Sequence, residues 1–174
     1  MRRLMLLRHG KSDSPSGVSD IDRPLARRGK EAVPRIATHM AEEQLFPDLA
    51  LVSPARRARE SWDLLAPKLG EVPARSEPRI YEAPPERLLA VIRELGPGVR
   101  SVLLVGHNPG LEDLAKLLIG HGDRYAFARI AKKYPTAGLA VLDLAIEGWR
   151  ELKPGSGRLD RFVTPKSLGQ DEDD

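Results

Sequence analysis

Two histidines follow apolar segments of the chain at points where the backbone is expected to turn. Leu4–Leu7 runs into Arg8-His9-Gly10, and Ser101–Val105 runs into Gly106-His107-Asn108-Pro109. An imidazole is a nucleophile and a proton carrier near neutral pH. A guanidinium is a permanently charged, planar fork that suits phosphate or carboxylate. These residue types therefore predict an anion site that contains a reactive imidazole.

A third apolar segment, Leu49–Val52, is followed by Ser53-Pro54, which is typical of a helix start with Ser as the N-cap and Pro in the first turn. Arg57 then falls on the first turn of that helix, and Arg56 is the alternative if the helix is rotated. The carboxyl ends of parallel strands meet at one edge of a sheet. We therefore expect two imidazoles, two guanidiniums and two helix N-termini to converge in one crevice.

This set of groups suits phosphoryl transfer, which needs positioning and positive charge more than covalent help. Arg8 and Arg57 would bind the phosphoryl oxygens, and a protonated His107 would add a third positive donor. His9 must be neutral to attack, and its other ring nitrogen should donate to a backbone carbonyl, which fixes the tautomer. We expect no metal and no other cofactor, because the arginines supply the positive charge. A His-His metal site also lacks a carboxylate at convincing ligand spacing.

Strand-like and helix-like segments alternate along the chain and predict an α/β domain, a three-layer α/β/α sandwich around a mostly parallel sheet. Strands are expected over Leu4–Leu7, 49–53 and 101–105, and a short edge strand within the irregular segment 71–83. Helices are expected over 27–44 (with a kink at Pro34 or a later start), from Ser53 to Gly70, from Pro84 to Leu95, and from Pro109 to about Gly120.

The C-terminal part of the chain is harder to assign. Residues 121–135 are polar and show no clear pattern, whereas 138–144 and 149–152 predict an antiparallel pair of strands. From Pro154 the sequence is rich in Gly, Ser and charge. We therefore expect one domain over residues 1–154 and a flexible charged tail over 155–174.

The composition is that of an ordinary globular protein, with 174 residues, 41% hydrophobic and 30% charged. The absence of cysteine excludes disulfides and fits a cytoplasmic location. No apolar run approaches the length of a membrane span or an export signal, so we expect no membrane association. The net charge is +3, and because Asp171–Asp174 are all acidic, residues 1–170 carry +7. This balance suits an acidic substrate.

Taken in order, Leu-Arg-His-Gly at 7–10, Ser-Pro-x-x-Arg-Ala at 53–58 and Gly-His-Asn-Pro at 106–109 resemble the histidine phosphatase superfamily. Asp22-Arg23-Pro24-Leu25 with Arg28-Gly29 is similar to its SixA-type branch of phosphohistidine phosphatases. The resemblance implies a phosphoglycerate-mutase-like fold with a minimal cap, and a hydrolase that forms a phosphohistidine at His9 of the Arg-His-Gly motif. It implies that Arg8, Arg57 and His107 bind the phosphoryl group.

The same resemblance suggests a glutamate as proton donor to the leaving group, with Glu82 the first candidate and Glu86 the second. A solvated Glu82 without a role is an equally good interpretation, because the P–N bond of a phosphohistidine is labile and needs little acid help. The expected partners are a phosphorylated substrate, either a protein phosphohistidine or a small phosphoester, and inorganic phosphate as product.

Two hypotheses of other classes compete with an enzyme. The same cavity could bind phosphorylated proteins without turnover, although every residue of the core motifs is present. Nucleic acid could bind an arginine-rich face, but the chain has only eight aromatic residues to interleave with it, so we expect no nucleic acid. The face would comprise Arg23, Arg27, Arg28, Arg56 and Arg59. His39 and His121 lie outside the motifs and are predicted to be surface residues.

Overall fold

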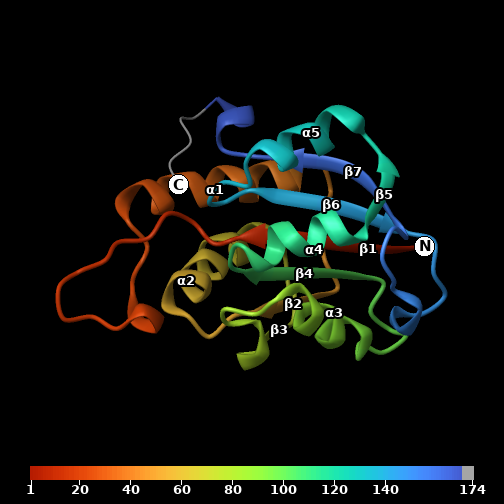
Figure 1. Ribbon diagram of the computed structural model, residues 1–174. Helices are drawn as coiled ribbons and strands as arrows, with labels where there is room; N and C mark the ends of the chain where they lie inside the picture. The colour runs from red at the N-terminus through yellow and green to blue at the C-terminus, as the bar shows by residue number, and fades with distance from the viewer. Residues whose placement is uncertain (170–174) are drawn as a thin grey trace.

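A single mixed sheet forms the centre of the computed structural model, which describes residues 1–169 (Figure 1). In this part of the chain seven strands are hydrogen-bonded in the order β3-β2-β4-β1-β6-β7-β5, with four parallel and two antiparallel pairings. The strands are β1 (Arg2–Arg8), β2 (Leu49–Val52), β3 (Ala74–Ser76), β4 (Ser101–Gly106), β5 (Ile119–Gly122), β6 (Leu139–Leu144) and β7 (Gly157–Val163). The predicted α/β class and the mostly parallel sheet are confirmed.

The apolar runs become strands because both faces of the sheet are covered. In β1, Leu4 and Leu6 enter one core while Met5 and Leu7 enter the other, and all four are fully buried. A run without polar alternation is the expected pattern for such a strand. β4 is central as predicted, since it lies between β1 and β2 and runs parallel to both.

Helices cover the two faces unequally. α1 (Arg27–Glu42) and α2 (Arg56–Leu65) contribute to the core that contains Met5 and Leu7. α3 (Pro85–Arg93), α4 (Gly110–Leu118) and α5 (Arg124–Lys132) contribute to the core on the other face. Figure 1 shows α3 and α4 in front of the sheet and α1 behind it. This is the predicted three-layer arrangement.

Two helix starts differ from the sequence-based expectation, those of α2 and α4, and the start of α1 decides between the two alternatives given for it. α1 begins at Arg27 with Pro34 inside it, so the alternative of a later start is wrong. α2 begins at Arg56 and not after Ser53, because the Ser53 hydroxyl oxygen accepts the N–H of Ala55 in the preceding turn. α4 begins at Gly110, one residue after Pro109. The side-chain oxygen of Asn108 does accept a backbone N–H of this helix, that of Glu112.

The C-terminal prediction is wrong in two respects. The partner of β6 is β7, and Trp149–Glu151 is a 3₁₀ turn, so 149–152 is not a strand. The boundary at residue 154 is also wrong, because Gly157–Val163 lies inside the sheet. The acidic run Asp171–Asp174 lies outside the described residues. Residues 121–135, left unassigned above, contain the end of β5 and the whole of α5.

Charged side chains make β7 difficult to recognise as a strand from the sequence. Arg158 donates to Asp143 of β6 at 2.8 Å, and Asp143 also accepts from Arg3 of β1 at 2.7 Å. Leu159 and Phe162 of the same strand, β7, are buried. A strand that carries ion pairs on one face therefore has the composition of a solvated tail. Within residues 1–169, no helix is both long and apolar enough to cross a membrane.

The contribution of β7 to stability can be measured with one substitution. Phe162 is 4% exposed and its ring centroid lies 4.9 Å from that of Tyr134. We expect Phe162→Ala to lower the free energy of unfolding by about 3 kcal/mol, because it leaves a cavity in the core. Lys166→Ala, an exposed control beyond β7, should change it by less than about 0.5 kcal/mol. Equal urea midpoints for the two variants would contradict this placement.

Candidate active site

The carboxyl ends of β1, β2 and β4 deliver their next residues to one cavity. Register pairs Leu7 with Val105 and Val52 with Val105, so the three strands end level with one another. The residues that follow these strands, His9, Ser53 and His107, therefore lie at the same edge of the sheet. The cavity there has a volume of about 310 Å³. It is lined by Arg8, His9, Lys11, Ser12, Arg23, Arg57, Glu82, His107, Asn108 and Thr136.

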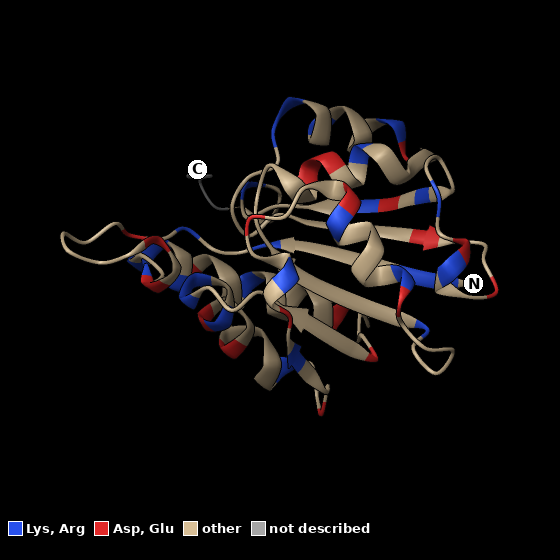
Figure 2. Cartoon of the chain, turned by 60° about the horizontal axis from the view of Figure 1, so that its bottom comes forward, with Lys and Arg blue, Asp and Glu red and all other residues tan. Residues whose placement is uncertain are grey.

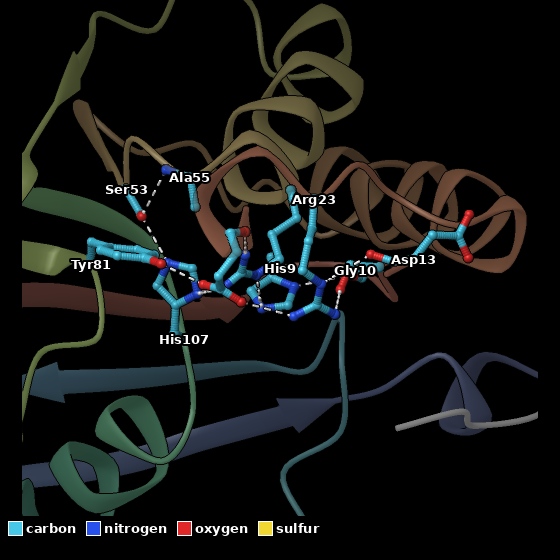
Figure 3. Close-up of polar contacts among 11 residues, drawn as sticks. His9, Gly10, Asp13, Arg23, Ser53, Ala55, Tyr81 and His107 are labelled. Atoms are coloured by element: carbon cyan, nitrogen blue, oxygen red, sulfur yellow. Dashed lines mark hydrogen bonds and ion pairs between the residues drawn. The ribbon is translucent and has the colours of Figure 1, made fainter. Parts of the chain in front are cut away.

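Arg57 contacts both imidazoles from the second position of α2. Its Nε lies 3.2 Å from Nε2 of His9, and its Nη2 lies 3.4 Å from Nδ1 of His107. The two rings have centroids 5.0 Å apart and are tilted by 58°. Figure 3 shows the two rings side by side. All five predicted site residues thus line one cavity, and they are Arg8, His9, Arg57, Glu82 and His107.

The alternative that Arg56 enters the site is wrong. Arg56 is exposed and its Nε donates to Glu60, one helical turn on, at 3.1 Å. Arg57 is 5% exposed. The helix is therefore rotated so that the second of the adjacent arginines faces the cavity.

The tautomer of His9 follows from its two neighbours. Nδ1 lies 2.8 Å from the carbonyl oxygen of Gly10, which can only accept, so Nδ1 carries the proton. Nε2 then has a lone pair, and it accepts from Arg57, since a guanidinium has no acceptor. Burial lowers the pKa of His9 well below its usual value, and His107, Arg57 and Arg8 lower it further. His9 is therefore neutral near pH 7, with its lone pair toward the cavity.

Gly10 is needed at this turn because of close packing. A Cβ atom there would lie 2.8 Å from Val33 Cγ2 of α1 and 3.3 Å from the backbone of Gly29. The N–H of Gly10 donates to the buried hydroxyl of Ser61 at 2.9 Å. The Gly10 carbonyl that orients His9 is thus fixed by contacts with both α1 and α2.

His107 is held on its opposite edge by Ser53. The Ser53 hydroxyl lies 2.7 Å from Nε2, which leaves Nδ1 directed toward Arg57. Burial lowers the pKa of His107 to about 4, and the positive charges of Arg57 and Arg8 act in the same direction. The imidazole is therefore neutral near pH 7 while the cavity holds no anion. A protonated His107, as expected from the sequence, requires proton uptake when a phosphoryl group binds.

Arg8 is fixed by the loop that precedes β6. Its Nη1 donates to the carbonyl oxygen of Tyr134 at 2.9 Å, and the same oxygen accepts from Asn108 at 3.2 Å. The N–H of Ala137, a residue with φ of 61°, lies 3.0 Å from the carbonyl oxygens of both Arg8 and His9. This loop begins in the stretch 121–135 that the sequence left unassigned, and it fixes the backbone of the Arg-His-Gly motif.

The structure separates the two glutamate candidates. Glu82 lines the cavity at its exposed rim, with a backbone φ of 51°. Glu86 lies in the first turn of α3 and does not line the cavity. Glu82 is therefore the candidate whose position fits a proton donor.

Sequence reasoning did not assign roles to Ser53, Asp20 or Tyr81. The sequence predicts Ser53 as a helix cap, whereas its hydroxyl also contacts His107. Asp20 accepts from Arg57 and Tyr81 across 37 and 61 residues of sequence. No local pattern signals such contacts. His39 is half-buried and His121 is exposed, and neither lines the cavity.

Residues 4–85 match the model of the histidine phosphatase superfamily (branch 1). A Mycobacterium tuberculosis protein of uncharacterised function is 36% identical over 162 residues, which cover 92% of this chain and 100% of the relative. The chain belongs to the histidine phosphatase superfamily.

Solved structures place it near the SixA type of this superfamily. A protein from Agrobacterium tumefaciens, provisionally named phosphohistidine phosphatase SixA, is 32% identical, with a TM-score of 0.81 over 94% of this chain and 98% of that one. A mycobacterial glucosyl-3-phosphoglycerate phosphatase shares the fold, with a TM-score of 0.67 and 20% identity over 92% of this chain and 97% of that one. The histidine phosphatase described here is accordingly a hydrolase with a phosphoglycerate-mutase-like fold.

The lowered pKa of His107 predicts a loss of stability in acid. Between pH 6.5 and about 4 the unfolded chain binds a proton at this imidazole and the folded protein does not, so stability falls as the pH falls. Relative to a His107→Gln variant, the wild-type free energy of unfolding should drop by about 3 kcal/mol across this range. Urea unfolding at several pH values measures the difference. A difference that stays constant over this range contradicts the neutral, buried state of His107.

Proposed function

We propose that this histidine phosphatase hydrolyses its substrate through a phosphohistidine at Nε2 of His9. The observation that supports this most directly is the pair of contacts on the His9 ring, with Nδ1–H donating to Gly10 and the Nε2 lone pair directed toward Arg57. A nucleophile must be unprotonated and must face the bound phosphorus. The unprotonated Nε2 of His9, directed toward the guanidinium proposed to bind the phosphoryl oxygens, supports this role.

In the proposed reaction, each bond that forms to phosphorus replaces a bond that breaks. Nε2 of His9 forms a bond to phosphorus while the bond to the leaving group breaks, and the leaving group takes the electron pair. Arg57 exchanges its bond to Nε2 for one to a phosphoryl oxygen, and Arg8 and a protonated His107 bind the others. Water then attacks phosphorus, the P–N electron pair returns to Nε2, and inorganic phosphate leaves.

For the substrate, we propose a phosphohistidine carried by a protein. The connections that border the cavity, 9–26, 53–55, 77–84 and 107–109, contain no α-helix within the described residues, and the two longer ones contain one 3₁₀ turn each. No helical cap covers this edge in residues 1–169, which suits a substrate presented on another protein. The fold match to a phosphatase that acts on a small phosphoester keeps that substrate class as the second candidate.

The arginine-rich face is poorly suited to bind nucleic acid, because several of its arginines already have partners in the protein. Arg27 pairs with Glu31 and Arg56 pairs with Glu60, each at 3.1 Å, and Arg59 donates to the carbonyl of Pro54. Figure 2 shows acidic and basic positions alternating on the helices at the left of the view. Binding through counterion release needs a continuous basic surface, so these pairs favour the phosphatase interpretation.

The covalent step can be tested directly. Incubation with a labelled phosphodonor should give an adduct that is labile in acid and stable in alkali, and His9→Ala should give no adduct and no turnover. His121→Ala, an exposed histidine away from the cavity, is the matched control and should behave like the wild type. Equal turnover by His9→Ala and wild type would overturn the mechanism. Adduct formation without phosphate release would instead support the phosphoprotein-binding hypothesis.

The substrate class and the role of Glu82 are tested together. Turnover of a phosphohistidine peptide is compared with that of phosphoesters for the wild type, Glu82→Gln and Glu86→Gln. We expect Glu82→Gln to slow phosphoesters by roughly 10²-fold, as loss of a general acid does, and to leave the phosphohistidine peptide nearly unaffected. Glu86→Gln should change neither. A wild type with higher kcat/KM on phosphoesters would favour the second candidate.

A further inference from the structure

Asp20 lies in the connection between β1 and α1 and accepts hydrogen bonds from three other residues. Its carbonyl oxygen accepts from Nη1 of Arg57 at 2.7 Å, and its Oδ2 accepts from Nη2 of the same arginine at 3.1 Å. Its Oδ1 accepts from Arg23 at 3.0 Å, and Oδ2 also accepts the hydroxyl of Tyr81. Figure 3 shows Tyr81 and Arg23 on opposite sides of the two histidines. Asp20 thus joins three separate segments at the rim of the cavity.

Two of these bonds fix the plane of the Arg57 guanidinium. When Nη1 and Nη2 both donate to atoms of one residue, the group cannot rotate without losing a bond. In the observed orientation Nε faces Nε2 of His9. We propose that Asp20 is a positioning residue that orients Arg57 for phosphoryl transfer, an inference that rests on the function proposed above.

The remaining bonds hold Asp20 itself in place, although its side chain is 42% exposed. Arg23 also donates to the carbonyl of Asp13 at 3.0 Å and to the hydroxyl of Ser12 at 2.8 Å, so it ties Asp20 to the start of its own loop. Tyr81 links Asp20 to the segment before α3, and its ring meets His107 edge-on at 5.5 Å. The Asp20 carboxylate is therefore held by Arg23 at one oxygen and by Tyr81 at the other.

Neither acid catalysis nor substrate binding accounts for a carboxylate at this place. The hydrogen bond from Tyr81, with those from Arg23 and Arg57, holds the pKa of Asp20 below its usual value, so it has no proton to donate. Its negative charge also repels a phosphoryl dianion. What it can supply is a fixed counter-charge and acceptor geometry for a guanidinium that is 5% exposed.

The two possible effects of this charge have opposite signs, which makes the test sharp. If Asp20 acts only as a nearby negative charge, Asp20→Asn should tighten the binding of inorganic phosphate and leave kcat unchanged. If Asp20 orients Arg57, Asp20→Asn should lower kcat by roughly 10- to 100-fold, the effect of small misplacements in an active site. It should also weaken inhibition by inorganic phosphate, despite the loss of a repulsive charge.

Asp22→Asn is the matched control, because Asp22 is exposed in the same 3₁₀ turn and its side chain accepts a hydrogen bond from the nearby Ser19 at 3.0 Å. We expect it to behave like the wild type. Tyr81→Phe removes one donor to Asp20 and should give a smaller loss of kcat than Asp20→Asn. Exchange of the Arg57 Nε proton, followed by NMR, should be accelerated in Asp20→Asn, and thermal melting shows whether each variant folds.

The outcomes separate this inference from the function on which it rests. A wild type without turnover, or turnover that survives His9→Ala, contradicts the proposed function. An active wild type with Asp20→Asn at equal kcat and tighter phosphate inhibition contradicts only the role of Asp20.

Discussion

The site depends on one buried cation placed between two imidazoles. Arg57 is 5% exposed and contacts both His9 and His107. A permanent positive charge in a protein interior disfavours further positive charge beside it. Burial lowers the pKa of both rings, and the charge of Arg57 acts in the same direction, so that both are neutral near pH 7. In the proposed mechanism, the guanidinium that adds to this effect on His9 is also the group that binds the phosphoryl oxygens.

The fold provides what this arrangement requires. Parallel pairing brings β1, β2 and β4 to a common edge, so that three turns far apart in sequence supply His9, Ser53 and His107. Hydrogen bonds then remove the freedom that each side chain has left: the Gly10 carbonyl orients His9, and Ser53 orients His107. Asp20 compensates the charge of Arg57 from the rim. Preorganisation of this kind is how fixed side chains can stabilise a transferring phosphoryl group.

The sequence predicted the elements whose signal is local. Apolar runs followed by Arg-His-Gly, Ser-Pro and Gly-His-Asn-Pro predicted three strand ends and, by their order, the residues that meet in the cavity. β7 was missed because it carries Arg158, Asp160 and Arg161, whose partners lie on β1 and β6, at the residue that follows α1, or within β7 itself. Asp20 and Tyr81 were also missed because their partners are distant in sequence. Their contacts with the site join segments distant in sequence, and no periodicity or cap motif encodes such a pair.

The central claim is that Nε2 of His9 is the atom that receives the phosphoryl group. The most direct measurement is ¹⁵N–³¹P coupling in a phosphoenzyme trapped with ¹⁵N-labelled histidine. The hydrogen bond from Nδ1 to Gly10 predicts a phosphorus bonded to Nε2 of His9, with Nδ1 still protonated. Phosphorus bonded to Nδ1, or to either nitrogen of His107, would contradict the account.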